Sequence, residues 1–393
     1  MDRIEPRFDS YRSPVIGTKG TVASSQPLAT AAGLRILAQG GNAADAAVGT
    51  AAALNVTEPS STGIGGDCFA LYYEAATQRV TALNGSGRAP AGLDLARLRR
   101  EGFEHQLPPF HAHTVTVPGA CAGWCDFIER HGSLPMSAIL TPAIELAEAG
   151  FPVAPLTSVF WRSAVKRQLE RSPGGRELTI EGRGPRAGEI FRNPGLARTL
   201  RAVAEKGAEA FYRGEIALAI HAVVQQHGGV LSTEDLAEHR STWEEPIHTR
   251  YRDLRVFECP PNGQGLTALL ALNLLRGFDL SGMDPLGPER YHLLIEAMRL
   301  GFADARWYVA DPDFSEIPLS ELLSEAYAAE RRKCIDPRRA GTDVLRGSPV
   351  GSSDTVYLCA VDAHGNGCSF INSNYMGFGT GLVPEGFGFT LQN

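Results

Sequence analysis

The chain has 393 residues, enough for one large domain or two closely packed ones whose core needs no disulfide bonds. Its 37 Lys and Arg residues against 44 Asp and Glu residues give a net charge of -7 and no long basic run, which argues against nucleic acid as a partner. Apolar runs are interrupted well short of the roughly 20 residues of a membrane helix, and "MDRIEPRFDSYRSP" lacks the apolar core of a secretory signal. Seven scattered cysteines, mostly among apolar neighbours, are typical of buried reduced thiols. We therefore expect a cytoplasmic protein with no membrane segment.

The first helical region predicted by the sequence spans residues 28–54. Its two halves are separated by Gly40 and Gly41, which readily adopt the left-handed conformation that ends a helix. The second half consists almost entirely of small apolar residues, and a helix with such residues on every face is usually buried. Two short strands should follow, "CFALYY" at 68–73 and "RVTAL" at 79–83, because both segments are rich in strand-favouring residues.

Amphipathic helices are predicted for the middle of the chain. Apolar residues recur every three or four positions in "TPAIELAEAGFPV" (141–153) and in "PERYHLLIEAMRLGFADARWYV" (288–309). Two segments rich in glycine, proline and charge, 170–189 and 334–354, are predicted to be flexible surface. The second of them ends at Thr355, where "TVYLCAV", "DAHGNG" and "CSFINS" predict a strand, a turn and a second strand.

The junction between Asp354 and Thr355 admits two interpretations. A β-branched residue is a common first residue of a strand. Alternatively, the hydroxyl of Thr355 attacks the Asp354 carbonyl carbon and the chain is cut, which frees an α-amino group with a pKa of about 7.7–8.0. That amine can take the proton from the hydroxyl of the same residue, which then serves as nucleophile and base in amide cleavage. The residues by themselves leave both interpretations open.

Other motifs carry weaker signals. "GIGGD" at 63–67 lacks the lysine and the Ser/Thr of a P-loop, so its glycines are interpreted as tight-turn residues. His111 and His113 form an HxH pair without further ligands at a recognisable spacing, and are expected to be solvated loop residues. Cys121 and Cys125 lack the second pair of a zinc finger. We expect no metal and no cofactor.

Four blocks of the sequence, in order, resemble the γ-glutamyltransferase family. They include "TGIGGD", "VPGACAGW", "PPNGQG" and "NYMGFGTG", and they cover residues 20–73, 117–153, 260–275 and 354–393. The resemblance implies an α+β fold, the four-layer αββα sandwich of N-terminal-nucleophile hydrolases. It also implies a proenzyme that cleaves itself before a threonine, which gives a large and a small subunit.

The resemblance also implies roles for individual residues. Alignment of the "DAHGNG" turn and the "GTG" segment places the family nucleophile on Thr355, and Ser373 falls where a family threonine hydroxyl supports it. The family arginine that binds the substrate's α-carboxylate aligns with Ser86, which cannot provide the planar bidentate fork of a guanidinium. Arg88, two residues on, is the candidate substitute. A family asparagine aligns with Tyr375, so Ser86, Arg88 and Tyr375 are the candidate substrate-binding positions.

These assignments divide the chain into a large-subunit region, 1–354, and the start of a small-subunit region, 355–393. The expected function is hydrolysis or transfer of γ-glutamyl-type amides, with a small-molecule amide as substrate and the two fragments of one precursor as partners. A cephalosporin-type or glutaryl acylase is the alternative enzyme, and a non-catalytic binding or scaffold protein is the alternative of another class. A homo-oligomer is possible on this interpretation. Because the family's small subunit continues further, we expect the printed chain to lack much of it and to be catalytically incomplete.

Overall fold

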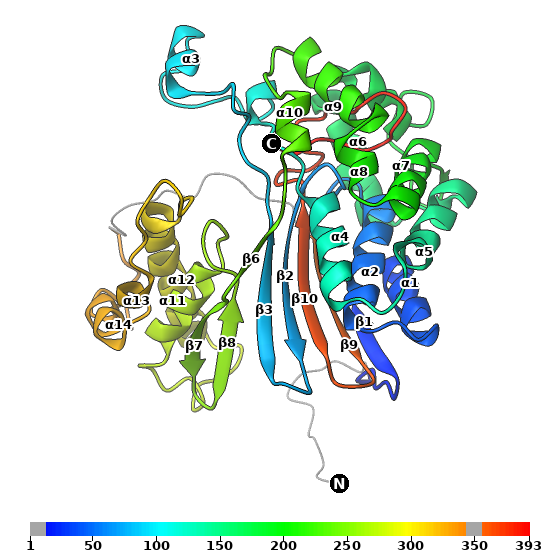
Figure 1. Ribbon diagram of the computed structural model, residues 1–393. Coiled ribbons are helices and arrows are strands. Elements are labelled where there is room, and N and C mark those ends of the chain that lie inside the picture. Colours follow the sequence, from blue (N-terminus) through cyan, green and yellow to red (C-terminus); the bar gives the residue numbers. More distant parts are fainter. Residues whose placement is uncertain (1–12, 343–355) are drawn as a thin grey trace.

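The largest sheet draws its strands from both ends of the chain (Figure 1). A computed structural model describes residues 13–342 and 356–393. The six antiparallel strands lie in the order β1-β9-β10-β2-β3-β6. Their bounds are Gly20–Ala23 (β1), Val356–Asp362 (β9), Gly367–Ser373 (β10), Asp67–Glu74 (β2), Arg79–Gly85 (β3) and Thr242–Glu244 (β6). The strand, turn and strand predicted after residue 355 are confirmed, and they occupy the middle of the sheet.

One face of this sheet is covered by helices. These are α1 (Pro27–Ala38), α2 (Ala43–Thr57), α4 (Ala120–His131) and α5 (Met136–Ala149) (Figure 1). The predicted helix pair is confirmed, and every residue of α2 is buried. Asn42 begins α2 as a reciprocal cap with Asp45, since the side chain of each accepts from the backbone of the other.

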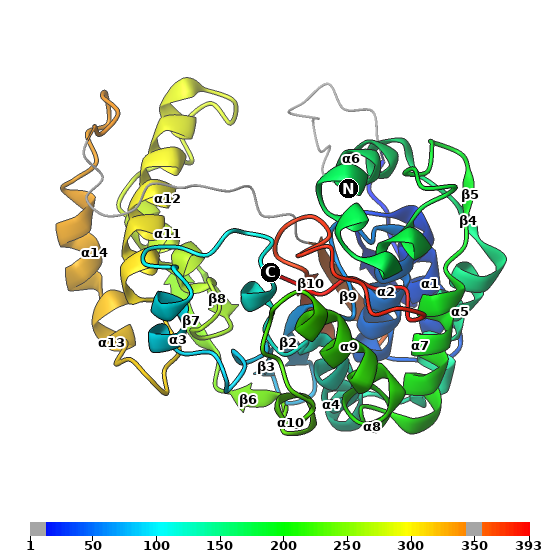
Figure 2. The same cartoon turned by 90° about the horizontal axis from the view of Figure 1, so that it is seen from above.

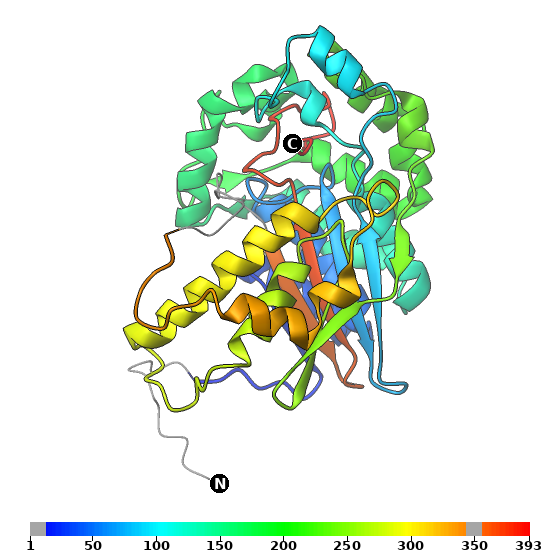
Figure 3. The ribbon, with the colours of Figure 1, turned by 90° about the vertical axis from the view of Figure 1, so that its left-hand side faces the viewer.

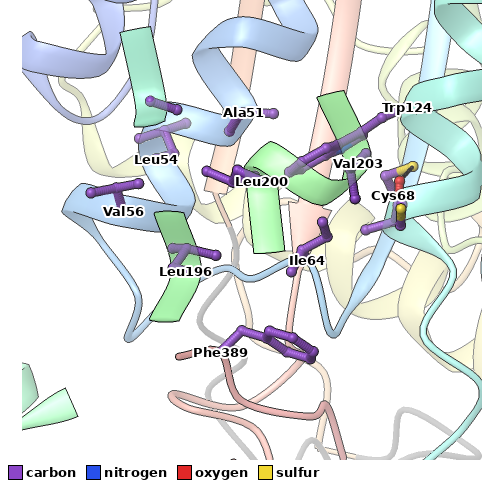
Figure 4. Close-up of a cluster of buried hydrophobic side chains, with 14 of the residues drawn as sticks. Ala51, Leu54, Val56, Ile64, Cys68, Trp124, Leu196, Leu200, Val203 and Phe389 are labelled. Atoms are coloured by element: carbon purple, nitrogen blue, oxygen red, sulfur yellow. Dashed lines mark hydrogen bonds between the residues drawn. The ribbon is translucent and has the colours of Figure 1, made fainter. Parts of the chain in front are cut away.

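The main hydrophobic core lies between this helical layer, the sheet and the C-terminal segment. Figure 4 shows a part of it, in which Leu54 of α2, Ile64 and Leu200 lie together with Phe389 near the end of the chain. Leu358, Ala360 and Phe370 contribute from the sheet, and their strand neighbours one position away point to the opposite face.

A second group of elements lies beyond the other face of the sheet (Figures 2 and 3). It contains β7 (Ile247–Tyr251), β8 (Leu254–Glu258), α11 (Leu266–Leu275), α12 (Pro288–Tyr308), α13 (Leu319–Leu322) and α14 (Glu325–Arg332). Two smaller apolar clusters of its own hold this group together, centred on α11 and α12. Helix α12 confirms the amphipathic helix predicted for 288–309.

The remaining elements surround the top of the sheet or the helical layer. They are α3 (Leu95–Arg100), η1 (Ala112–Thr114), β4 (Phe151–Pro152), α6 (Pro155–Arg167), η2 (Leu169–Arg171), η3 (Pro173–Leu178), β5 (Ile190–Phe191), α7 (Pro194–Lys206), α8 (Glu209–Tyr212), α9 (Glu215–Gln226) and α10 (Thr233–Ala237).

The prediction of a flexible surface for 170–189 is wrong in its first half. Ser172, Gly174 and Leu178 are buried there, in or next to the short helix η3. The Ser172 hydroxyl accepts from the Val383 N–H at 3.1 Å, and a side chain at Gly174 would collide with the Val383 carbonyl. The segment is ordered because the C-terminal residues pack on it, a contact that its local composition does not encode. Of the other segment predicted as surface, 343–354 lies outside the described residues.

Candidate active site

Strand register brings the start of β9, the end of β10 and the start of β2 together at the upper edge of the sheet in Figure 1. Strand β9 begins at Val356, which pairs with Asn372, and β10 ends one residue later at Ser373. Ser373 pairs in turn with Asp67, the first residue of β2. The predicted nucleophile Thr355 and the predicted cleavage residue Asp354 lie outside the described residues. In the sequence, Thr355 directly precedes Val356, the first residue of β9.

Ser373 is held in place by the backbone that follows it. Its Oγ accepts a hydrogen bond from the Tyr375 N–H at 2.9 Å. Tyr375 has a φ of 70°, a left-handed conformation that non-glycine residues rarely adopt, and its side chain is 52% exposed. The turn therefore presents the Tyr375 ring to solvent beside the strand end, and the roles predicted for Ser373 and Tyr375 remain predictions.

The "GIGGD" segment packs directly against Ser373. Gly66 donates to the Gly63 carbonyl at 3.1 Å, which confirms the predicted tight turn. A Cβ on Gly66 would lie 1.9 Å from the Ser373 carbonyl oxygen, so only glycine fits at this approach. The Gly66 carbonyl accepts from Gly119 and Ala120, both at 2.9 Å, and thereby connects the turn to the start of α4.

The Ser86 hydroxyl already has partners on both sides. It donates to Asn84 Oδ1 at 2.7 Å and accepts from Asn262 Nδ2 at 3.0 Å, while Asn84 Nδ2 donates to Asn262 Oδ1 at 2.7 Å. The three side chains form a closed set of hydrogen bonds between β3 and the loop before α11. The single hydroxyl proton of Ser86 is engaged, so this side chain has no donor left for a substrate carboxylate.

Arg88 is not a member of this hydrogen-bonded cluster. Its carbonyl accepts from the Val117 N–H at 3.0 Å, which fixes the backbone, and its side chain is exposed. Burial, and to a smaller extent the positive charge of Arg88, lowers the pKa of His239 to about 4. The ring of His239 lies 5.2 Å from that of Tyr212. The structure therefore places the guanidinium near His239, and no described acidic side chain forms an ion pair with it.

Asp67 is the site residue that the sequence interpretation missed. Its Oδ1 accepts from the Gly87 N–H at 3.0 Å, between Ser86 and Arg88. Burial raises the pKa of the Asp67 carboxyl to about 7, although hydrogen bonds from Gly87, Gln392 and Gly119 act in the opposite direction. A signal was available in the sequence, since Asp67 is the charged residue at the point where a glycine-rich turn becomes a buried strand.

The expectation of solvated loop histidines is wrong for His113. Its side chain is fully buried and its Nε2 lies 2.5 Å from a carboxylate oxygen of Glu101. His111 is partly exposed, and its Nδ1 accepts from the His113 N–H.

Within residues 13–342 and 356–393, no group of three or more His, Cys, Asp or Glu side chains could hold a metal ion. The seven cysteines are free, and four are buried. None of the described helices is both long and apolar enough to cross a membrane.

Comparison with known proteins gives a consistent result. The sequence model described as gamma-glutamyltranspeptidase matches residues 29–393. The glutathione hydrolase-like YwrD proenzyme of Bacillus subtilis (strain 168) is 37% identical over 379 residues, which cover 96% of this chain and 71% of the relative. The acylase ACY 1 proenzyme of Pseudomonas sp. (strain SE83) is 34% identical over 397 residues, which cover 98% of this chain and 71% of that protein.

Solved structures agree with the sequence relatives. The crystal structure of cephalosporin acylase from Bacillus halodurans superposes with a TM-score of 0.89 at 45% identity, covering 100% of this chain and 72% of that chain. For the Helicobacter pylori gamma-glutamyltranspeptidase the TM-score is 0.77 at 29% identity, with 84% and 96% coverage. The expected fold class and family are confirmed. The chain belongs to the gamma-glutamyltranspeptidase family of N-terminal-nucleophile hydrolases, enzymes that cleave amides or transfer their acyl groups.

Proposed function

We propose that the precursor is cut between Asp354 and Thr355 and that Thr355 then serves as the nucleophile. The observation that carries this proposal is the register at the sheet edge. Even-numbered residues of β9 such as Val356 are buried on the helical side, whereas Tyr357 is 55% exposed on the other face. Thr355 directly precedes Val356 in the sequence, and Ser373 and Asp67 lie at the adjoining strand ends, on the same face of the sheet as Tyr357.

Self-cleavage would proceed by an acyl shift. The Thr355 hydroxyl attacks the carbonyl carbon of Asp354, the peptide C–N bond breaks, and the acyl group passes from nitrogen to oxygen. Water then hydrolyses the ester, which leaves a carboxylate on Asp354 and a free α-amine on Thr355. The relatives are named proenzymes, in agreement with such a step.

In turnover, the freed amine of Thr355 accepts the hydroxyl proton while the oxygen attacks the substrate amide. The C–N bond of the substrate breaks, the leaving amine takes that proton, and an acyl ester remains on Thr355. Water or an acceptor amine attacks the ester and restores the hydroxyl. Ser373 is the proposed support for the nucleophile. No cofactor enters this sequence of steps.

The two regions, 1–354 and 355–393, are proposed to remain associated after the cut. Strand β9 pairs with β1, and β10 pairs with β2, so each of these pairs joins one strand from either side of the cleavage point. Separating the fragments would expose the unpaired edges of the central strands. The cytoplasmic location and a homo-oligomeric state remain proposals from the sequence.

A second candidate function is an acylase that prefers donors other than γ-glutamyl amides. It is favoured by the engaged hydroxyl of Ser86, which occupies the position of the family's carboxylate-binding arginine, and by the proximity of the Arg88 charge to His239. Loss of a bidentate carboxylate contact typically reduces specificity by about tenfold to a thousandfold. Glutathione-like donors should therefore be poor substrates. The cephalosporin acylase of Bacillus halodurans is a similar structure whose name fits this alternative.

The experiment that tests the proposal is amino-terminal sequencing of the small fragment, which should begin Thr-Val-Tyr-Leu. Thr355→Ala should remain uncut, while Thr355→Ser, which keeps a hydroxyl, should still be processed. A different start would remove Thr355 from the role. An uncut chain that releases nothing from any amide would favour the scaffold interpretation.

Donor selectivity is tested on a panel of γ-glutamyl, glutaryl and cephalosporin amides. Ser86→Arg should improve γ-glutamyl donors if the carboxylate contact is simply missing. Ordinary γ-glutamyl turnover that disappears in Arg88→Ala would instead show that Arg88 binds the carboxylate, and would contradict the acylase alternative.

A further inference from the structure

We propose that Asp67 is a positioning residue, which holds the Ser86–Arg88 segment at a fixed place beside Ser373 and thereby sets the affinity for the acyl donor. This inference rests on the proposed function, because it concerns the same site. Asp67 lies between two positions of that site, since it pairs with Ser373 on one side and its carboxylate reaches the segment after β3 on the other.

The segment is clamped from two directions. On one side, Asp67 Oδ1 accepts the Gly87 N–H at 3.0 Å. On the other, the Val117 N–H donates to the Arg88 carbonyl at 3.0 Å, and a Cβ on Gly87 would lie 1.5 Å from the Val117 carbonyl oxygen. Gly87 therefore lies directly against residue 117, and the Asp67 carboxylate is its hydrogen-bond acceptor on the β2 side.

Asp67 is itself fixed on the sheet. Its backbone carbonyl accepts from Asn372 Nδ2 at 2.9 Å, and the same amide donates to the Gly63 carbonyl at 3.2 Å. Asn372 is fully buried next to Ser373 in β10. Hydrogen bonds from Asn372 to Asp67 and from Gly87 to Asp67 thus connect β10 to the segment that carries Ser86 and Arg88.

Few charged groups surround this carboxylate. The segments packed around it are 63–66, 86–88, 116–119, the end of β10 and the residues near Gln392. In the described parts of these segments the charged side chain is that of Arg88, which lies near His239. Cys68, the next residue of β2, carries a buried thiol whose pKa is raised, so it stays neutral.

The protonation state of Asp67 should therefore affect the clamp. The pKa of about 7 means that the carboxyl is largely neutral at pH 6 and largely ionised at pH 8. A hydrogen bond to an ionised acceptor is roughly twice as strong as one to a neutral acceptor. The Gly87 N–H is consequently held more tightly as the pH rises, and the KM for an amide donor should fall with it.

The test compares Asp67→Asn, which keeps an oxygen acceptor without a charge, with Asp67→Ala, which removes the acceptor. In the processed enzyme, Asp67→Ala should raise KM about tenfold while kcat stays within about threefold. The wild-type KM should fall about threefold or more from pH 6 to pH 8, and Asp67→Asn should lose this dependence. Glu74→Gln, an exposed change at the other end of β2, is the matched control and should behave as wild type.

A second readout does not depend on turnover. Hydrogen exchange of the Gly87 amide is measured in the uncut Thr355→Ala chain, with and without Asp67→Ala or Asp67→Asn. Exchange should be about tenfold faster with Asp67→Ala and close to the parent with Asp67→Asn at pH 6. Unchanged exchange at Gly87, or equal KM and pH dependence in wild type and Asp67→Asn, would overturn the positioning role. If the wild-type chain is inactive but Gly87 exchanges faster in Asp67→Ala, the result would contradict the proposed function. It would still support the role of Asp67 in holding Gly87.

Discussion

The sheet carries one structurally important aspartate at each end, and the two carboxylates differ in the hydrogen-bond donors that surround them. At the lower end in Figure 1, Asp362 accepts from the N–H groups of His364 and Asn366 at 2.9 and 3.0 Å, from Asn366 Nδ2 at 2.8 Å and from the Ala43 N–H at 3.1 Å. Ala43 is the first residue of α2, so the carboxylate also lies at the positive end of a helix dipole.

Asp67, at the upper end, is less completely compensated. Burial is the largest influence on its carboxyl and raises the pKa to about 7, despite the hydrogen bonds from its neighbours. The comparison teaches that a buried carboxylate becomes a structural anchor where donors and a helix terminus saturate it, as at Asp362. Where donors are fewer, as at Asp67, the same side chain can change its charge near neutral pH.

The largest expected effect is loss of the anchor at Asp362. Asp362→Ala should lower the free energy of unfolding by about 3–5 kcal/mol, because it leaves the buried Ala43 N–H and the part-buried donors of His364 and Asn366 without their acceptor. Urea titration followed by circular dichroism measures this. Asp362→Asn keeps one oxygen acceptor and should lose about half as much. A loss below about 1 kcal/mol for Asp362→Ala would show that water replaces the carboxylate.

Close packing at the upper end gives the next largest effect. Gly66→Ala places a methyl group against the Ser373 carbonyl, so the β10 end must move, and we expect a loss of about 2–3 kcal/mol together with slower self-cleavage. Gly367→Ala is the control at the other end of the same strand, since a Cβ there meets nothing within 4 Å. It should change stability by less than about 0.5 kcal/mol. Equal losses at the two glycines would mean that strand propensity, rather than contact with Ser373, decides the result.

The dependence of stability on pH should report the protonation of Asp67. The pKa of Asp67 is about 7 in the folded chain against an ordinary value of 3.8, so between these values the folded state keeps a proton that the unfolded state has lost. The unfolding free energy must therefore fall as the pH rises from about 4 to about 7. Because the residue as a whole is only half-buried, solvent screens part of this difference, and we expect only about 1–2 kcal/mol from this group.

The contribution of Asp67 is isolated by subtracting the unfolding free energy of Asp67→Asn from that of wild type at each pH, since the amide does not titrate in that range. The difference should favour wild type at pH 4 and decline toward pH 7. A flat difference would contradict the raised pKa.

Local patterns predicted the elements but not the contacts between them. The glycine pair at 40–41 and the small residues after it were sufficient for α1 and α2, because helix caps and helix burial depend on neighbouring residues. The alternation from 356 to 362 was sufficient for β9. Segment 170–189 was mispredicted because its order depends on Val383, about two hundred residues away.

In the candidate active site, too, local patterns identified residues but not the contacts between them. Ser373 was identified through resemblance, and strand register was needed to bring it beside Asp67. The engagement of Ser86 depends on Asn262, which lies in a distant loop. His113 was taken for a solvated residue because its partner, Glu101, lies twelve residues earlier, at the end of the short helix α3. Each of these relations is a tertiary contact that spacing along the chain does not reveal.

The smallest expected effect concerns Ser86. Because its hydroxyl is bonded to Asn84 and Asn262, Ser86→Ala should change the selectivity among amide donors by less than about threefold and reduce stability by about 1 kcal/mol. Asn262→Ala removes two hydrogen bonds from the same cluster and should reduce stability about twice as much, again with little change in selectivity. Ratios of kcat/KM for γ-glutamyl and cephalosporin amides measure the first quantity. A selectivity change above tenfold in Ser86→Ala would mean that the hydroxyl leaves its partners to contact the substrate, and would return Ser86 to the set of substrate-binding residues.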